Sequence, residues 1–340
     1  MAVSVIIVNW NGKKCLTECL DALRNQEFED FSTILVDNGS NDGSVDFVGQ
    51  NYPEVKTIAL SENVGFSAAN NIALKTIRTP YVALLNNDAT AHPSWLKNLV
   101  QALENFKEAG FAASKICFSN DPSRIDRAGD SYTIAGVGLL RGRGMPSGAY
   151  NRQEWVLGAC AAAAIYRTEM LYDIGLFDED FYLLYEDVDL SLRAQLSGYR
   201  CLFVPEAIVY HKVSSSIMRD SPVSVYYGHR NLEWVYFQNM PWRLILKTIL
   251  PHILYDVAAF FFFAANGRVT DFVKAKWHAL KGIKMTVKKR RKVQDKMRIP
   301  EGYLWSLLEK ERLLPRLTMR AGRDFAGTKG VPGQTTGVRG

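Results

Sequence analysis

Strands and helices alternate regularly along the first hundred residues, and this pattern restricts the fold more than any other feature of the chain. Short apolar runs typical of buried strands are separated by amphipathic stretches of helical length. Because consecutive parallel strands need a crossover connection, the alternation predicts an α/β fold with a mostly parallel sheet and helices on both faces. The expected strands cover residues 3–8, 33–36, 55–60 and 81–85, and the expected helices cover 13–25, 44–50, 67–77 and 93–105.

The end of the fourth expected strand gives the strongest local signal. Five apolar residues, Tyr81 to Leu85, are typical of a strand buried on both faces, and Asn86, Asn87 and Asp88 follow directly. In open parallel sheets the ligand lies at the carboxyl ends of the strands. Carboxylate and amide oxygens suit a hard divalent cation that bridges to substrate phosphates. Taken alone, the tripeptide is equally compatible with a simple turn.

Two earlier strands also end in polar segments. Asp37 and Asn38 follow the second strand, where an aspartate can accept a hydrogen bond from the ring N–H of uracil or thymine. Asn63 and Gly65 precede a helix that contains Asn70, and the N-terminus of such a helix favours a phosphate. The alternatives are a plain turn for the first segment and a simple helix cap for the second.

Glu186 and Asp187 begin an expected helix, directly after an aromatic run that ends at Tyr185. Acidic residues in a first helical turn commonly stabilise the helix dipole. Aromatic neighbours raise the pKa of a carboxyl group, however, so either carboxylate is a candidate general base. His211 lies beyond a short expected strand at residues 200–204. A lone histidine there is usually structural, but beside Asp88 its imidazole would suit a metal.

The pattern weakens between residues 110 and 150, where we expect a sheet edge and a mobile loop that serves as a lid. The following segment, residues 155–167, contains Trp155 and a run of small residues around Gly158. We expect this segment to form either the floor of a binding site for an acceptor substrate or a buried strand of the core.

Charge is distributed unevenly along the chain. Residues 1–230 contain 20 Lys and Arg against 27 Asp and Glu, a net charge of −7, whereas residues 231–340 contain 21 against 8, a net charge of +13. The basic part includes an apolar stretch at residues 244–265 and a basic block, Lys288 to Lys292. Four residues interrupt the apolar stretch, so a simple membrane span is not expected: Lys247, Pro251, His252 and Asp256.

An apolar helix beside a basic block suits the interface of an anionic leaflet. The alternative is a helical subdomain that packs on the catalytic body with a solvated basic face. No motif for reading nucleic acid accompanies the basic block, so nucleic acid is not an expected partner. The chain opens directly into a strand and its five cysteines have no zinc spacing. We therefore expect reduced thiols and a cytoplasmic protein, peripheral on the cytoplasmic face of the inner membrane.

These changes along the chain predict three parts. Residues 1–222 are expected to form the catalytic domain, and residues 223–298 a helical, basic region that associates with membranes. Residues 299–340 are expected to form a C-terminal helix followed by a disordered tail, since residues 322–340 have no apolar periodicity.

Together the motifs resemble the inverting glycosyltransferases of family 2, which have the nucleotide-binding GT-A fold. The resemblance rests on the segments 5–11, 37–40, 63–65, 86–88 and 186–187, in this order and approximate spacing. It covers residues 1 to about 215 and is strongest for the rhamnosyltransferase-like branch, whose tail it follows to about residue 298. One motif departs from the family pattern, because Asn86-Asn87-Asp88 replaces the common Asp-x-Asp. This replacement implies a lower affinity for metal.

The resemblance implies a role for each motif. Asp88 and His211 would ligate Mn²⁺ or Mg²⁺, and Asp187 would be the catalytic base, with Glu186 as the next candidate. Acceptor or sugar contacts would come from Trp155, Gly158 and Tyr185. The donor would be bound by a larger set: Asn9, Asn11, Asp37, Asn38, Asn63, Gly65, Asn70, Asn86 and Asn87.

We therefore expect a metal-dependent inverting hexosyltransferase that acts on a polysaccharide or lipid-linked glycan acceptor. The resemblance favours L-rhamnose from dTDP-rhamnose, with a UDP-sugar as the other donor class. Alternatives are a galactosyl- or glucosyl-type transferase of the same family and a non-catalytic, membrane-tethered relative. A sugar-phosphate nucleotidyltransferase is less compatible, because residues 9–12 lack the glycine-rich basic phosphate loop of that class. A homo-oligomer is compatible with the sequence.

Overall fold

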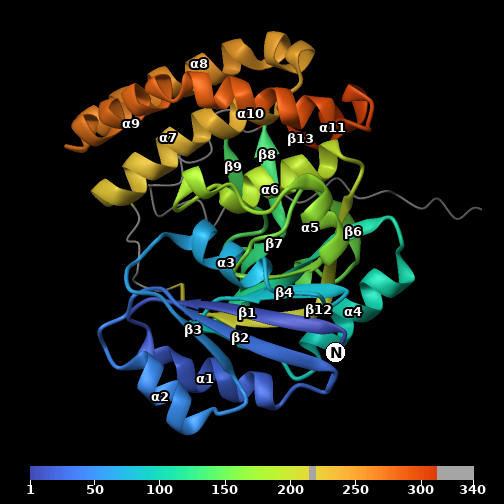
Figure 1. Cartoon of the computed structure of the whole chain (residues 1–340). Coiled ribbons are helices and arrows are strands. Elements are labelled where there is room, and N and C mark those ends of the chain that lie inside the picture. The colour runs from blue at the N-terminus through green and yellow to red at the C-terminus, as the bar shows by residue number, and fades with distance from the viewer. Residues whose placement is uncertain (214–219, 312–340) are drawn as a thin grey trace, which may run out of the picture.

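A mixed ten-stranded sheet forms the centre of the computed structural model, which describes residues 1–213 and 220–311 (Figure 1). Four parallel strands lie at one side of the sheet in the order β4-β1-β2-β3. Their bounds are Val3–Asn9 for β1, Phe31–Asp37 for β2, Lys56–Ala59 for β3 and Tyr81–Leu85 for β4. This arrangement confirms the α/β sheet predicted from the alternating pattern.

Helices cover both faces of this sheet (Figure 1). The first four are α1 (Lys13–Arg24), α2 (Ser44–Asn51), α3 (Phe66–Leu74) and α4 (Trp95–Asn105), close to their predicted ranges. Alternate residues of β1 point to opposite faces, as the period of a strand requires. Val5 and Ile7 pack in one core with Leu16 of α1, whereas Ile6 packs in a second core with Ala69 of α3.

The segment between residues 110 and 150 does not form the predicted sheet edge. Its first part is β6 (Ala109–Phe118), an almost completely buried strand between β11 (Ala163–Arg167) and β12 (Arg200–His211). The rest forms β7 (Asp121–Ala128), β8 (Asp130–Thr133), β9 (Gly138–Leu140) and the short helix η1 (Ser147–Ala149). The prediction was wrong because β6 consists largely of small residues, and its partners come from segments later in the chain.

The strand expected at residues 200–204 continues to His211, with a register shift between Val204 and Ile208. One edge of β12 pairs with β10 (Glu154–Val156), and its far end pairs with β5 (Ala89–Ala91). In the β5 pairing, His211 lies opposite Ala89. This antiparallel pairing brings His211 next to the end of β4. Helices α5 (Thr168–Ile174) and α6 (Glu186–Leu196) and the 3-10 helix η2 (Glu179–Phe181) complete this part.

The C-terminal part is helical, as predicted. It contains α7 (Pro222–Asn239), α8 (Trp242–Ala265), α9 (Val269–Lys281), α10 (Ile283–Asp295), α11 (Glu301–Leu307) and the short strand β13 (Leu308–Glu309), which joins β8 and β9 in a second sheet. These helices form a layer at the top of Figure 1. A third core unites Tyr132 and Val188 with Leu232 and Tyr255, so the layer packs on the part of the chain that contains the large sheet.

The division of the chain at residues 222 and 298 stays a prediction. The tail expected to be disordered, residues 322–340, lies outside the described residues.

Candidate active site

Asn9 and Asp37 meet at the carboxyl ends of β1 and β2, where they are directly paired. Both are buried, and Asn9 Nδ2 donates to Asp37 Oδ2 at 2.9 Å. The other carboxylate oxygen accepts the backbone N–H of Ser40 at 2.9 Å. Each oxygen of a carboxylate can accept two hydrogen bonds, so Asp37 retains the capacity to accept the N–H of a base.

The predicted donor loops fold against this pair. Asn38 Nδ2 donates to Asn63 Oδ1 at 3.0 Å, and Asn63 Oδ1 also accepts the backbone N–H of Gly65 at 2.9 Å. Gly65 has a φ of +87°, and a Cβ there would lie 2.5 Å from the ring of Tyr182, so only glycine fits. Asn11 contacts the loop after β2, because its Oδ1 accepts the backbone N–H of Asn41.

Of two further residues predicted to bind the donor, Asn87 contacts the Asn9–Asp37 pair and Asn70 does not. Asn87 links the tips of β4 and β1, because its Nδ2 donates to Asn9 Oδ1 at 2.8 Å. Asn70 is not brought into this network: its Nδ2 donates to the carbonyl of Phe66 one turn earlier in α3. Donor binding by Asn70 stays a prediction.

Asp88 and His211 lie side by side, with Asp88 Oδ1 at 3.2 Å from His211 Nε2. The side chain of Asn86 lies 3.5 Å from the same nitrogen. The other ring nitrogen, Nδ1, is 2.9 Å from Asp126 Oδ2, and Asp126 in turn pairs with Arg143 at 2.5 Å. A carboxylate that holds Nδ1 fixes the orientation of the ring and directs Nε2 towards a ligand position.

The donor atoms of Asp88 and His211 fit a divalent metal. A carboxylate oxygen and an imidazole nitrogen converge, and the imidazole has the outer carboxylate that metal-binding histidines usually have. Burial lowers the pKa of His211, but hydrogen bonds to Asp126 and Asp88 outweigh burial and raise it to about 9. A cation at this position would therefore replace a proton.

Glu186 and Asp187 form the first turn of α6. Asp187 Oδ2 lies 3.7 Å from the guanidinium of Arg127 and 3.4 Å from the backbone N of Ala161. Arg127 also pairs with Asp130, at 3.2 Å. Burial raises the pKa of Asp130 to about 7; attraction to Arg127 opposes this rise, and repulsion from Asp187 adds to it. Asp187 thus belongs to a network of charges at the edge of the sheet.

Glu186 has a different environment from Asp187. It is 8% exposed, and its Oε2 has no hydrogen-bond partner among the described residues. Burial, together with repulsion from Asp187, raises the pKa of Glu186 to about 8. A carboxyl group with this pKa is mostly protonated at pH 7 and must lose its proton before it can act as a base; the role of Asp187 as the base stays a prediction.

The pKa of Glu186 predicts a pH-dependent stability. Its pKa rises from an ordinary value of 4.5 to about 8 on folding, so the folded state binds the proton more tightly. This contribution to the free energy of unfolding is complete below pH 4.5 and is lost as the pH rises to about 8. In Glu186→Gln this loss should be absent. The difference in Tm between variant and wild type, measured in EDTA, should increase from pH 5 to 8 and then level. If the Tm of Glu186→Gln and the Tm of the wild type changed with pH in parallel, the raised pKa of Glu186 would be contradicted.

Four charged residues of the site were not identified from the sequence. They come from the segment that was interpreted as a lid: Asp126, Arg127, Asp130 and Arg143. Asp126, Arg127 and Asp130 lie between Ile125 and Tyr132, and Arg143 lies outside this stretch; no local sequence signal placed the four residues at the site.

Of the three predicted acceptor residues, Tyr185 directly precedes Glu186 and the backbone of Gly158 pairs with that of Asp130, whereas Trp155 lies apart from the carboxylates. Trp155 stacks on the guanidinium of Arg200, 3.7 Å from the ring centre, at the other end of β12 from His211. Tyr185 is buried in the third core, where its hydroxyl accepts the N–H of Gly138. Gly158 lies next to α6, since a Cβ there would be 2.5 Å from Ser191 Oγ. Their contact with an acceptor stays a prediction, whereas the alternative of a buried strand is confirmed for Ala163–Arg167.

Comparison with known proteins gives consistent results. Residues 4–175 match glycosyl transferase family 2. Over 275 residues the chain is 25% identical to N-acetylglucosaminyl-diphospho-decaprenol L-rhamnosyltransferase of Mycobacterium tuberculosis. This match covers 72% of this chain and 88% of the relative.

Two solved structures have a similar fold. S. aureus TarS 1-349 in complex with UDP has a TM-score of 0.53 and 21% identity, with 90% of this chain and 92% of that chain covered. Mannosyltransferase PcManGT from Pyrobaculum calidifontis, in complex with GDP-Man and Mn²⁺, has a TM-score of 0.52 and 17% identity, with 90% and 85% covered.

The sheet, with its polar groups at the strand ends, and the family match together define a glycosyltransferase of the GT-A fold that takes its sugar from a nucleotide sugar. Because the match spans more than half of the sequence, the chain belongs to glycosyltransferase family 2. Inversion of the anomeric centre is typical of this family.

Proposed function

We propose that this glycosyltransferase is metal-dependent and transfers L-rhamnose from dTDP-rhamnose to a polysaccharide or lipid-linked glycan. One observation carries the proposal of metal dependence: the convergence of Asp88 Oδ1 and His211 Nε2 at 3.2 Å, after β4, the strand that pairs with β1. The choice of rhamnose is supported by the similarity to the mycobacterial L-rhamnosyltransferase. A galactosyl- or glucosyl-type donor is the second candidate.

The site residues divide the reaction among them. Asp37 would accept the N–H of the base, and Asp88 and His211 would hold Mn²⁺ or Mg²⁺. When bound, the cation supplies positive charge that neutralises the diphosphate leaving group. Asp187 would take the proton of the acceptor hydroxyl while the oxygen of that hydroxyl forms a bond to the anomeric carbon of the sugar. The bond to the diphosphate breaks on the opposite face, so the anomeric centre inverts in one step.

A panel of nucleotide sugars with purified protein tests this proposal. We expect release of nucleoside diphosphate from dTDP-L-rhamnose with Mn²⁺ and little release in EDTA. Turnover of UDP-galactose or UDP-glucose instead would favour the second candidate. If no donor turns over, calorimetry with dTDP or UDP and Mn²⁺ separates two cases. Metal-dependent binding would indicate a missing acceptor, and absence of binding to any nucleotide would overturn the proposal in favour of a non-catalytic relative.

We also propose that the outer surface of the helical layer lies on an anionic membrane. Among the described residues, α8 is the one helix long and apolar enough to cross a membrane by length and composition. One face of α8 packs inward, with His252, Tyr255 and Phe263 buried. Its opposite face exposes a continuous apolar row that includes Leu250 and Phe261, which are 63% and 66% exposed: Leu246, Leu250, Ile253, Leu254, Val257 and Phe261.

Helices α9 and α10 also expose apolar and basic side chains. The exposed apolar side chains are Val273, Trp277, Leu280, Ile283 and Val287. Exposed basic residues on α10 accompany them: Lys284, Lys288 and Arg291. An amphipathic surface of this kind suits the boundary between acyl chains and anionic headgroups. These observations favour a helix that lies in the interface.

The basic block is not uniformly available for lipid. Lys289 turns inward and pairs with Asp178, at 2.5 Å, and with Asp180. Arg290 donates to the carbonyls of Phe237 and Met240, at 2.8 and 2.6 Å, and so caps the end of α7. The interpretation of Lys288–Lys292 as one lipid-binding block is therefore corrected, because two of its five members stabilise the fold.

Vesicle binding tests the membrane proposal. We expect Lys284→Glu/Lys288→Glu to lower the partition onto phosphatidylglycerol-containing vesicles by at least tenfold, because each basic residue near an anionic surface contributes about 1 kcal/mol. The matched control, Lys56→Glu/Lys107→Glu, reverses two exposed lysines of the catalytic body and should bind normally. Equal binding of both variants in a flotation assay, at low and high salt, would contradict the proposal.

A further inference from the structure

The segment directly before the two candidate catalytic carboxylates has an unusual backbone. Tyr182, Leu184 and Tyr185 have φ values of +62°, +66° and +70°. None of them is glycine, and side-chain-bearing residues rarely adopt this left-handed conformation. Such a backbone persists only where its surroundings hold it. Tyr185 immediately precedes α6, so the conformation of the segment sets the position at which Glu186 and Asp187 begin the helix.

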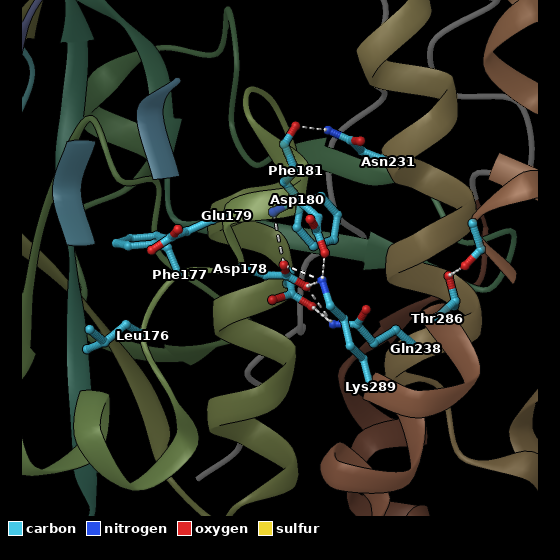
Figure 2. Close-up of polar contacts among 12 residues, drawn as sticks. Leu176, Phe177, Asp178, Glu179, Asp180, Phe181, Asn231, Gln238, Thr286 and Lys289 are labelled. Carbon is cyan, nitrogen blue, oxygen red and sulfur yellow. Dashed lines mark hydrogen bonds and ion pairs between the residues drawn. The ribbon is translucent and has the colours of Figure 1, made fainter. Parts of the chain in front are cut away.

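Asn231 of α7 is the main contact that holds this segment. Its Nδ2 donates to the carbonyls of Phe181, Leu183 and Leu184 at 3.0, 2.8 and 2.7 Å, and the side chain is fully buried. Figure 2 shows the contact with Phe181. An amide has two N–H groups, so the three carbonyls share them. One side chain therefore satisfies most of the backbone acceptors of the segment.

The opposite side of the segment contacts the donor loop. The carbonyl of Tyr182 accepts the backbone N–H of Phe66 at 2.8 Å. The side-chain hydroxyl of Tyr182 lies 3.4 Å from Asn63 Oδ1. The Tyr182 ring fills the space that the missing side chain of Gly65 leaves. The segment thus lies between the predicted donor loop and α7, and it carries the carboxylates at its end.

A second anchor lies just upstream. Asp178 accepts the backbone N–H of Asp180 at 3.1 Å, which closes the turn of η2. Lys289 of α10 binds both of these carboxylates, as Figure 2 shows. Gln238 of α7 also reaches Asp178, at 3.4 Å. Two helices of the C-terminal layer therefore hold the approach to the catalytic carboxylates from outside the catalytic body.

We propose that Asn231 is a positioning residue for sugar transfer. It holds the backbone of residues 181–185, in which Tyr182, Leu184 and Tyr185 have positive φ. This conformation fixes the start of α6, and thereby the orientation of Asp187 towards the acceptor. The catalytic consequence rests on the proposed role of Asp187 as the base, whereas the conformational role of Asn231 stands without it. The helical layer then has a function in catalysis in addition to its proposed contact with membranes.

Hydrogen exchange measured by mass spectrometry tests the conformational role. Asn231→Asp has the same shape but replaces the donating NH₂ by an oxygen that faces three carbonyls. We expect peptides covering residues 178–187 to exchange at least tenfold faster, with β1 and β4 unchanged. The control, Val235→Ala, removes two methyl groups one turn further along α7, from a fully buried residue of the third core. It should not accelerate residues 178–187 selectively.

Kinetics tests the catalytic role. For the donor that the wild type turns over with Mn²⁺, Asn231→Asp should lower kcat at least tenfold and change KM for the donor less than twofold. Val235→Ala should keep kcat. Equal exchange of residues 178–187 in both variants, or a wild-type kcat in Asn231→Asp, would overturn the proposal.

If Asn231→Asp does not fold, a second variant keeps the proposal testable. Asn231→Ser retains one donor and should show the same changes at smaller amplitude. Wild-type exchange and a wild-type kcat in Asn231→Ser would equally overturn the proposal. A wild type that neither turns over a donor nor binds any nucleotide would contradict the proposed function, and the exchange result would still decide the conformational role of Asn231.

Discussion

Asp187→Asn is expected to lower kcat for sugar transfer by roughly 10²–10⁴-fold, the usual contribution of a general base. The amide cannot take the proton of the acceptor hydroxyl, although its shape is unchanged. Asp187 lies 3.7 Å from Arg127 and makes no contact with the Asn9–Asp37 pair among the described hydrogen bonds. Binding of nucleoside diphosphate with Mn²⁺ should therefore remain within about twofold. Steady-state transfer assays and calorimetry measure the two quantities separately.

Glu186→Gln is the matched control for this variant. Glu186 has a pKa of about 8 because it is buried, so it is largely protonated at pH 7 and glutamine resembles its protonated form. We expect its kcat at pH 7 to stay within about tenfold of wild type. Full activity of Asp187→Asn together with a large loss in Glu186→Gln would reverse the assignment and make Glu186 the base.

Local sequence signals were sufficient for the first half of the fold. The strand Tyr81–Leu85 has the bounds that its apolar run predicts, because a strand buried on both faces needs an unbroken run and ends where polar residues begin. Asp37 ends one such strand and Asn87 follows another, so their hydrogen bonds with Asn9 at one edge of the sheet follow from parallel packing. Each step of this prediction depends on residues that are close in sequence.

The remainder of the site depends on pairings between distant segments. His211 reaches Asp88 because the end of β12 pairs antiparallel with β5, more than a hundred residues earlier in the chain. Arg127 and Asp130 reach Asp187 from a segment whose small and charged residues indicate no regular element. Lys289 gave no sign of its inward orientation, since α10 has basic residues on several faces and its partner Asp178 is on a distant turn. Such contacts become visible only when the topology is known.

Asp88→Ala is expected to abolish the Mn²⁺-dependent binding of nucleoside diphosphate, with a loss of at least about 100-fold in metal affinity. The variant removes one of the two predicted protein ligands, and His211 alone would remain. Asp126→Asn is the graded comparison, because it leaves both ligands in place and weakens the contact that orients His211, together with the ion pair between Asp126 and Arg143. Loss of such an outer partner typically costs about 10–100-fold in metal affinity. Titration of each variant with Mn²⁺ in the presence of UDP or dTDP measures the series.

The pH dependence of metal binding distinguishes ligation by His211 from a merely structural effect of Asp88→Ala. Without metal, hydrogen bonds to Asp126 and Asp88 raise the pKa of His211 to about 9, so between pH 7 and 9 the protonated ring must lose its proton before it can bind a cation. The Mn²⁺ affinity of the wild type should therefore rise by about tenfold per pH unit in this range and level above pH 9. Calorimetry in buffers of different ionisation enthalpy should show about one proton released per Mn²⁺ bound at pH 7. An affinity independent of pH, or an Asp88→Ala variant that binds Mn²⁺ as tightly as wild type, would place the metal elsewhere.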